Sequence, residues 1–110
     1  MSNNIEILFG LEQKTIDLIV HTIAKKEKVK KIVLFGSRAK GNYKKGSDID
    51  LALFSENLDY NELLKIKVEI NGLLLPYKID VLDFYKIKNE ELKEHIERVG
   101  KIIFQRCFFF

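Results

Sequence analysis

The sequence has few of the residues that stabilise proteins through covalent bonds or metal ions. Its 110 residues include one cysteine, Cys107, and two histidines. A single cysteine cannot form an intrachain disulfide, and two scattered histidines do not provide the ligand spacing of a zinc site. The composition therefore excludes a disulfide framework and a structural zinc centre, and it is consistent with a reducing compartment.

Long apolar runs are also missing. No run approaches the roughly 18 residues that a membrane-spanning helix needs. The polar start, MSNN, lacks the charged and apolar regions of a signal peptide. We therefore expect no membrane association and a cytoplasmic location.

The excess of basic over acidic residues is small, because the net charge is only +3. Dedicated nucleic-acid binders carry a much larger basic excess, so we expect no nucleic-acid partner. Hydrophobic residues make up 46% of the chain and charged residues 32%, which is typical of a folded protein. The length and the absence of repeats, low-complexity segments or linkers predict one domain over residues 1–110.

Hydrophobic periodicity predicts the order helix, two strands, helix, strand, helix, strand. The first helix is expected to begin near residue 11, or before Gly10. A short helical turn and a basic loop are expected between the first two strands. The predicted helices are 11–26, 60–71 and 89–99, and the predicted strands are 29–35, 47–54, 78–84 and 101–104.

The helix at 60–71 has sequence signals at both ends. Asp59 and Glu62 have the spacing of a capping box, in which each side chain accepts from the backbone of the other residue. Gly72 follows the helix and is expected to take the left-handed conformation that often ends helices.

Two acidic residues lie within the strand predicted at 47–54. Asp48 and Asp50 are two positions apart, so both side chains project from one face, opposite Ile49 and Leu51. Neighbouring carboxylates repel each other unless a cation or protons intervene, and Mg²⁺ suits them because it accepts carboxylate and phosphate oxygens. Alternatively, the pair simply lines the solvated face of a sheet.

Gly36 and Ser37 directly follow the preceding strand and favour the metal interpretation. Glycine lets a phosphate approach the backbone closely, and the NH groups of a turn can bind it. Nearby basic residues could neutralise phosphate or simply line the surface; they are Arg38, Lys40, Lys44 and Lys45.

A third carboxylate would complete a metal site. Asp80 lies in the middle of the strand predicted at 78–84 and could lie beside the first pair. Asp83 is an odd number of residues from Asp80, so its side chain is expected on the opposite face of the strand, and it lies nearer the strand end. Asp80 is therefore the predicted third ligand.

Together these residues resemble the nucleotidyltransferase superfamily with the DNA polymerase β-like catalytic fold. Its signature is GS, a gap, DxD and a carboxylate on a later strand, and the stretch GSRAKGNYKKGSDIDL is most similar to the minimal nucleotidyltransferases, or MNT proteins. The resemblance implies an α+β fold of two layers, with a small mixed sheet of about four strands and helices mainly on one face.

The resemblance also implies a reaction. Asp48, Asp50 and Asp80 would be catalytic residues and would bind Mg²⁺, with two ions expected. ATP would be the substrate, with Gly36 and Ser37 on its β and γ phosphates. The other implied nucleotide-binding residues are Arg38, Lys40 and Ser47.

Family members of this kind are often encoded beside a HEPN-domain partner and act as its antitoxin. The resemblance thus implies transfer of AMP to a tyrosine of a HEPN toxin, within a homodimer or a hetero-oligomer. The small size agrees, because no segment is left to form an acceptor pocket. Two alternatives stay open: a non-catalytic antitoxin that occludes its partner, or nucleotidyl transfer to a small molecule or an RNA end.

The end of the chain, QRCFFF, is unusual because chain ends are normally polar. Phe108 to Phe110 are expected either to fold back on the domain or to take part in a subunit contact.

Overall fold

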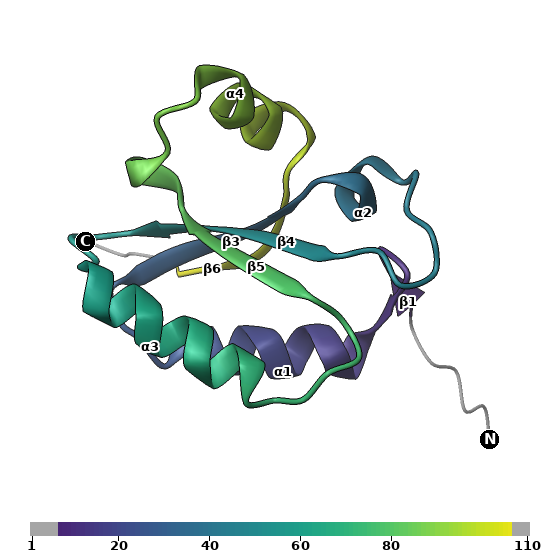
Figure 1. Ribbon diagram of the computed structural model, residues 1–110, viewed down its shortest axis with the longest axis horizontal. Coiled ribbons are helices and arrows are strands. Elements are labelled where there is room, and N and C mark those ends of the chain that lie inside the picture. Colours follow the sequence, from purple (N-terminus) through teal and green to yellow (C-terminus); the bar gives the residue numbers. More distant parts are fainter. Residues whose placement is uncertain (1–6, 107–110) are drawn as a thin grey trace.

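The computed structural model describes residues 7–106, so Cys107 and the segment Phe108 to Phe110 lie outside the described residues. Its centre is a sheet in the order β5-β4-β3-β6 (Figure 1). β3 is antiparallel to β4 and to β6, whereas β4 and β5 are parallel. The strands are β3 (Val29–Phe35), β4 (Ile49–Ser55), β5 (Ile79–Asp83) and β6 (Lys101–Gln105). The mixed four-stranded sheet is thus confirmed.

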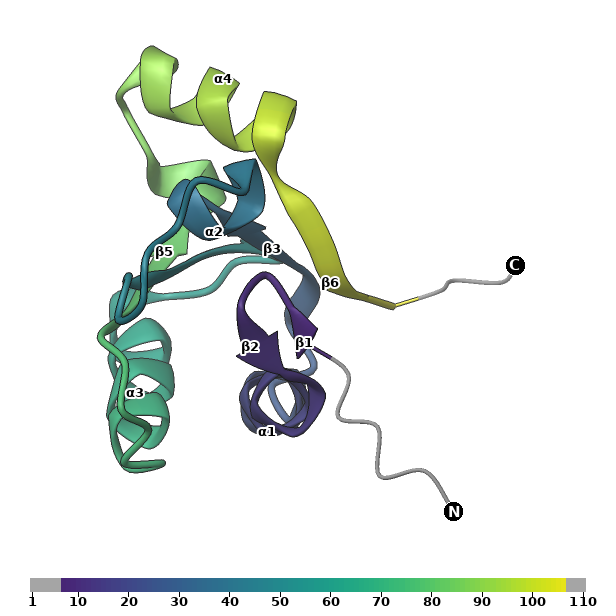
Figure 2. The same cartoon turned by 90° about the vertical axis from the view of Figure 1, so that its right-hand side faces the viewer.

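Two long helices cover one face of this sheet. α1 (Gln13–Ala24) and α3 (Tyr60–Asn71) lie side by side beneath the strands in Figures 1 and 2. Their apolar side chains meet the strand residues that point the same way, including Ile49, Leu51 and Leu53, all at most 1% exposed. Burial of these side chains is the main stabilising contribution of the layer.

The opposite face is partly covered by α4 (Glu90–Val99), which Figure 2 shows on the other side of the sheet from α1. Ile96 of α4 is buried against Val33 and Ala52. Further along the face, the rings of Phe54 and Phe84 stack with centroids 4.2 Å apart. α4 and these aromatic rings therefore occupy the apolar part of the face that carries Asp50.

Short elements join the larger ones. Residues before α1 form a hairpin of β1 (Ile7–Leu8) and β2 (Leu11–Glu12), so the expectation of a helix beginning before Gly10 was wrong. The hairpin turns at Phe9 and Gly10, both with positive φ. α2 (Ser37–Lys40) is the predicted helical turn after β3, and a 3₁₀ turn, η1 (Phe84–Lys86), follows β5.

The ends of α3 show one correct and one wrong prediction. The capping box is present: Glu62 N donates to Asp59 at 2.8 Å and Asp59 N donates to Glu62 at 3.2 Å. Gly72, however, has the right-handed helical backbone conformation, with φ −66° and ψ −14°. The chain continues for one more turn and becomes left-handed at Leu74, φ 55°, so the reversal occurs two residues later than expected.

Across residues 7–106 we find no helix that combines the length and the apolar character required to cross a membrane.

Candidate active site

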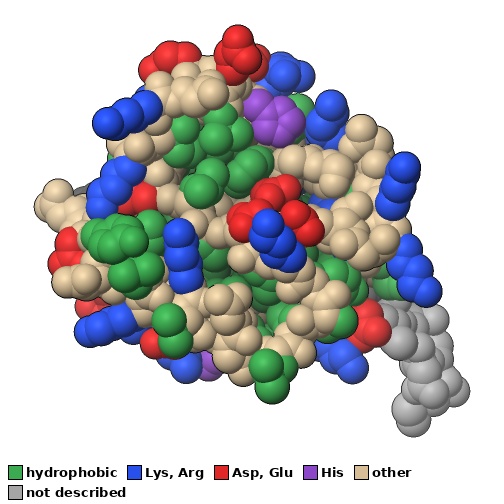
Figure 3. All heavy atoms as spheres, viewed as in Figure 1, with side chains coloured by type: hydrophobic (Ala, Val, Ile, Leu, Met, Phe, Trp, Pro, Cys, Tyr) green, Lys and Arg blue, Asp and Glu red, His purple; other side chains and the backbone are tan. Residues whose placement is uncertain are grey.

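The two parallel strands bring two of the predicted acids side by side. Asp50 of β4 and Asp80 of β5 are register partners, so their side chains leave the same face of the sheet at neighbouring positions. Asp48 immediately precedes β4 and is exposed, whereas Asp50 and Asp80 are half-buried. In Figure 3, red carboxylates gather near the middle of the face that looks toward the viewer.

The electrostatics of Asp50 reflect this crowding. Burial raises the pKa of Asp50 above its ordinary value, and the negative charges of Asp80 and Asp48 raise it further. Lys78 and His95 oppose the shift because their positive charges favour the carboxylate. Asp50 is therefore the acid on which the charges of both other aspartates act.

The fit to Mg²⁺ can be judged from the donors. Carboxylate oxygens are the hard ligands that Mg²⁺ prefers, and three aspartates around Asp50 supply them. Within residues 7–106, however, no group of three His, Cys, Asp or Glu side chains is arranged to hold an ion. The chemistry of the donors fits the ion.

The Gly36–Ser37 turn lies against the same carboxylate. Gly36 directly follows β3 and has φ 77° and ψ −155°, a region that residues with side chains essentially avoid. A Cβ at this position would clash with the carboxylate of Asp50. The half-buried Ser37 then begins α2. The structure therefore places the predicted phosphate turn directly beside the predicted metal ligands.

Arg38, a predicted phosphate ligand, is turned into the protein and is only 2% exposed. Its guanidinium donates twice to Ser47 O, at 3.1 and 2.8 Å, and once to Phe9 O at 2.9 Å. The Tyr43 and Tyr77 rings lie 5.5 and 5.0 Å from its central carbon. This geometry makes Arg38 a structural residue that ties three loops together, and it does not support a direct contact with nucleotide phosphate.

The other predicted basic and hydroxyl residues lie around the loop that follows α2. Lys40 is exposed at the end of α2. The Ser47 hydroxyl accepts from Lys44 N at 2.8 Å, so it closes a turn directly before Asp48. Lys44 and Lys45 are exposed on this loop.

Three residues outside the predicted site approach the acids from other elements. A cavity of about 450 Å³ contains Asp50 and Asp80 and is also lined by Lys67 and Asn71 of α3. His95 of α4 packs edge-on against Phe35, with ring centroids 6.2 Å apart. No local signal in the sequence marks these residues, because packing of α3 and α4 against the sheet brings them to the site.

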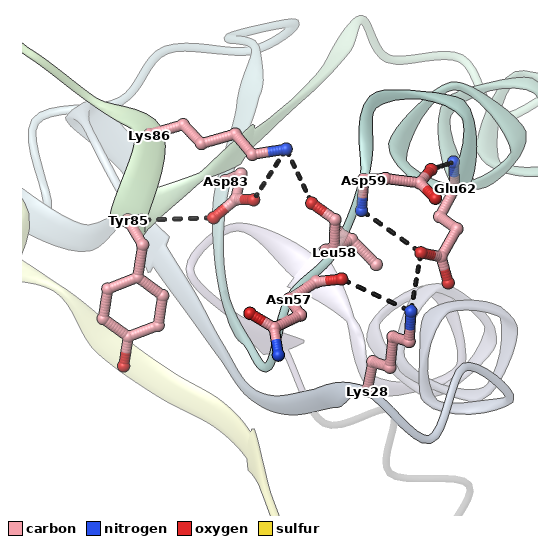
Figure 4. Close-up of polar contacts among 8 residues, drawn as sticks. All are labelled: Lys28, Asn57, Leu58, Asp59, Glu62, Asp83, Tyr85 and Lys86. Carbon is pink, nitrogen blue, oxygen red and sulfur yellow. Dashed lines mark hydrogen bonds and ion pairs between the residues drawn. The ribbon is translucent and has the colours of Figure 1, made fainter.

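Asp83, whose position in the strand predicts the opposite face from Asp80, lies away from the other acids, beside Tyr85 and Lys86. Its side chain accepts from Tyr85 N at 3.1 Å and pairs with Lys86 at 3.7 Å (Figure 4). Lys86 also donates to Leu58 O at 2.6 Å, and Lys28 donates to Asn57 O at 3.3 Å. Asp83 thus belongs to a set of contacts that hold the loop between β4 and α3.

A mixed sheet of this topology, with acids at the starts of two adjacent strands and a Gly-Ser turn at the end of a third, defines the nucleotidyltransferase fold class. Residues 17–107 match the model of the family described as "Polymerase beta, Nucleotidyltransferase". The chain therefore belongs to this nucleotidyltransferase family.

Curated relatives carry related names. The chain is 40% identical over 70 residues to "Probable protein adenylyltransferase MntA" of Haemophilus influenzae, a match that covers 63% of this chain and 60% of that protein. It is 30% identical over 102 residues to "Putative protein adenylyltransferase MJ0604" of Methanocaldococcus jannaschii, covering 84% of this chain and 98% of that protein.

Solved structures share the fold. A toxin-antitoxin crystal structure with AMP-PNP aligns with a TM-score of 0.69 at 22% identity, covering 83% of this chain and 73% of the matched chain. A second match is a complex of a tri-AMPylated Shewanella oneidensis HEPN toxin with an MNT antitoxin. It has a TM-score of 0.65 at 21% identity, with 86% and 72% covered.

Proposed function

We propose that this protein is an Mg²⁺-dependent nucleotidyltransferase that transfers AMP from ATP to a tyrosine of a HEPN-domain toxin and so acts as its antitoxin. The observation that carries the proposal is the register pairing of Asp50 with Asp80 beside the Gly36 turn. Support for the acceptor comes from the adenylyltransferase names of the relatives and from the AMPylated toxin in a structure of the same fold. We place the reaction in the cytoplasm.

The reaction joins the acceptor oxygen to the α-phosphorus of ATP. The bond between that phosphorus and its bridging oxygen to the β-phosphate breaks, and pyrophosphate leaves with the bonding electrons. Backbone NH groups of the Gly36–Ser37 turn would hold the β and γ phosphates. Asp80, which lies beside Asp50 on the edge strand, would receive the proton of the acceptor hydroxyl.

Asp48, Asp50 and Asp80 would hold Mg²⁺, which when bound supplies charge neutralisation for the triphosphate and favours in-line displacement. The raised pKa of Asp50 agrees with this role, because a cation is the natural counterpart of crowded carboxylates.

A partner would complete the acceptor side of the site. β5 is an edge strand, and the cavity that contains Asp50 and Asp80 lies along it. α4 covers only the part of the same face around Ile96. An acceptor protein could therefore approach the acids from the β5 edge and exclude water from the reaction, which correct positioning requires.

The proposal is tested with ATP labelled at its α-phosphate, Mg²⁺ and the HEPN-domain protein encoded beside this chain. We expect label on the partner with the wild-type chain and none with the double variant Asp48→Asn, Asp50→Asn. Asp17→Asn, which removes an exposed carboxylate from α1, is the matched control and should transfer normally. Absence of label with the wild type in a stable complex contradicts the proposal.

A toxicity assay separates transfer from occlusion. If neutralisation depends on transfer, cells that express the partner with the double variant should not grow. Full neutralisation by a double variant that transfers no label would show that the chain neutralises its partner by binding alone.

A further inference from the structure

A cavity of about 550 Å³ lies at the carboxyl ends of the two parallel strands, β4 and β5. It is lined by Ser55 at the end of β4, by the loop that leads into α3, by Asp83 at the end of β5, and by η1. We call it the carboxyl-end pocket. Its volume falls within the range of small-molecule sites, roughly 300 to 1,000 Å³. Among the described residues, none lines both this pocket and the cavity that contains Asp50 and Asp80, so the reaction at the acids does not account for it.

The hydroxyl of Ser55 lacks a hydrogen-bond partner. Ser55 is only 7% exposed, and its Oγ atom makes no hydrogen bond with any of residues 7–106. Most buried polar groups in proteins are paired, because a buried hydroxyl without a partner costs free energy. A ligand that enters the pocket with an N–H donor would therefore give this hydroxyl the partner that the described part of the chain does not supply.

The charged side chains of the pocket leave one negative charge uncompensated. Asp83 pairs with Lys86 at 3.7 Å, and Lys86 also donates to Leu58 O at 2.6 Å (Figure 4). The Lys86 ammonium is therefore already bound within the protein. Glu56 is exposed, and its carboxylate forms no ion pair or hydrogen bond with the residues that the structure describes. The pocket thus favours a ligand with a positive charge.

An aromatic ring forms one wall of the pocket. Tyr85 is 66% exposed, but its ring is held edge-on against Phe54 and Phe84, with ring centroids 5.7 and 5.8 Å away. Its backbone N–H donates to Asp83 at 3.1 Å, which fixes the start of the side chain (Figure 4). A ring that is held in place before a ligand binds can stack on a planar cation at a low entropic cost.

Arginine is the side chain that satisfies these three features together. Its guanidinium group is planar and always charged, and it carries five N–H donors and no acceptor. It could stack on the Tyr85 ring while it donates to the Ser55 hydroxyl and the Glu56 carboxylate. The ammonium group of lysine is a compact charge without a flat face. We propose that the carboxyl-end pocket binds an arginine side chain of a protein partner.

The position of the pocket suits a protein partner. Asp50 and Ser55 are five residues apart on β4, which corresponds to about 17 Å along the strand. One protein that covers the acids could therefore reach the pocket with a second part of its surface. Exposed tyrosine and incoming arginine are also residue types that contribute strongly to protein interfaces. The link to the acids rests on the proposed function, whereas the chemistry of the pocket does not.

The first test titrates the full chain with N-acetyl-L-argininamide and follows the backbone amide signals of residues 55–58 and 83–86 by NMR. N-acetyl-L-citrullinamide is the matched ligand, because its side chain has nearly the same shape and no charge. We expect the arginine compound to bind at least tenfold more tightly. Equal affinities of the two compounds, or shifts confined to other parts of the chain, would overturn the proposal.

Variants then test the charge and the ring. Glu56→Gln and Tyr85→Ala should each weaken binding of the arginine compound about threefold, as expected for an exposed ion pair and an exposed cation–π contact. Tyr85→Phe should bind as the wild type does. The controls are Tyr60→Ala and Glu91→Gln, which remove an exposed tyrosine from α3 and an exposed carboxylate from α4. Unchanged binding by both Glu56→Gln and Tyr85→Ala would refute the proposal.

Ser55→Ala tests the buried hydroxyl. It should weaken binding of the arginine compound about tenfold, because a hydrogen bond to a charged group is lost. It should not lower the melting temperature of the free chain, because the hydroxyl has no partner to lose. Normal binding by this variant would overturn the proposal. A lower melting temperature would show that the hydroxyl is paired in the free protein, and would also overturn it.

The last test measures the affinity of the full chain for the HEPN-domain protein of the proposed function. The double variant Glu56→Gln, Tyr85→Ala should weaken this complex about tenfold. Equal affinities of the wild type and the double variant would overturn the assignment of the arginine to a protein partner. If the wild-type chain does not bind or label that protein, the proposed function is wrong, while the titration with the arginine compound still decides the pocket.

Discussion

At the residue scale, Gly36 illustrates how closely the Gly36–Ser37 turn and Asp50 are packed. Its backbone has φ 77° and ψ −155°, and the carboxylate of Asp50 occupies the space that a side chain would need. A residue with a Cβ at this position would therefore strain the backbone and also displace the carboxylate of Asp50. These two effects can be separated by experiment because the chain contains another glycine with positive φ and open surroundings.

Gly36→Ala should destabilise the protein by about 1 to 3 kcal/mol and abolish AMP transfer, because the methyl group forces Asp50 out of position. Gly41→Ala is the matched control: Gly41 has φ 93° and no atom within 4 Å of an added Cβ. The Gly41→Ala variant should lose stability but retain AMP transfer. Thermal melts and labelled-ATP assays of both variants check this, and equal activity of the two would contradict it.

Single residues also show what the sequence could not reveal. Gly36, Ser37 and the aspartates could be predicted as site residues because their types and spacing form a local pattern. Arg38 was predicted to bind phosphate from its charge and from the family resemblance, but its partners Phe9 and Tyr77 are far away in the sequence. Burial by distant loops determines what such a side chain contacts, so only the folded structure could reassign it.

At the scale of elements, the parallel pairing of β4 and β5 places like charges side by side. Asp50 has a raised pKa in the folded state, first through burial and then through Asp80 and Asp48. When it is ionised, it therefore lowers the free energy of unfolding. This penalty is complete above the folded-state pKa and disappears as the pH falls below the unfolded-state pKa.

Asp50→Asn should accordingly raise the melting temperature by a few degrees at pH 7 without divalent ions, since it removes the repulsion. The advantage over the wild type should shrink as the pH is lowered into the range where carboxylates become protonated. Added Mg²⁺ should stabilise the wild type more than the variant. Melts in buffers from neutral to acidic pH test this, with Asp17→Asn as the control. A variant that is less stable than the wild type at pH 7 would refute it.

Helices and strands with strong local signals were predicted well. The capping box of Asp59 and Glu62 marks the start of α3, and β-branched and apolar residues mark β3. The two-residue strands of the β1–β2 hairpin were missed because they are too short to show periodicity. Gly72 was misjudged because the following turn depends on Leu74, which adopts a positive φ without a glycine.

At the scale of the whole molecule, Arg106 connects the last strand to the first helix. Its guanidinium donates to Val29 O at 2.9 Å and to Lys26 O at 3.2 Å, and it also donates to Ala24 O at the end of α1. These acceptors lie about eighty residues earlier in the chain. Positive charge near the last carbonyls of a helix is favourable, so this contact holds α1 and β6 together.

Arg106→Met should therefore destabilise the protein by about 2 kcal/mol, through the loss of hydrogen bonds from a charged group. Arg98→Met provides the comparison, because Arg98 makes only an exposed pair with Glu94 at 2.8 Å and should cost a few tenths of a kcal/mol. Denaturant unfolding measures both. Similar losses in the two variants would show that the contacts of Arg106 do not stabilise the fold.

The parallel register of β4 and β5 has a consequence for how the chain can vary in length. Side chains alternate between the faces of a strand, so a shift of one residue in β5 would exchange Asp80 for Val81 opposite Asp50. The carboxylate would then point toward α3, and a valine would face the other two acids. The segment 72–78 therefore sets the register of β5. An insertion or deletion of an odd number of residues that the loop cannot absorb would move the Asp80 carboxylate away from Asp50 without replacing a single amino acid.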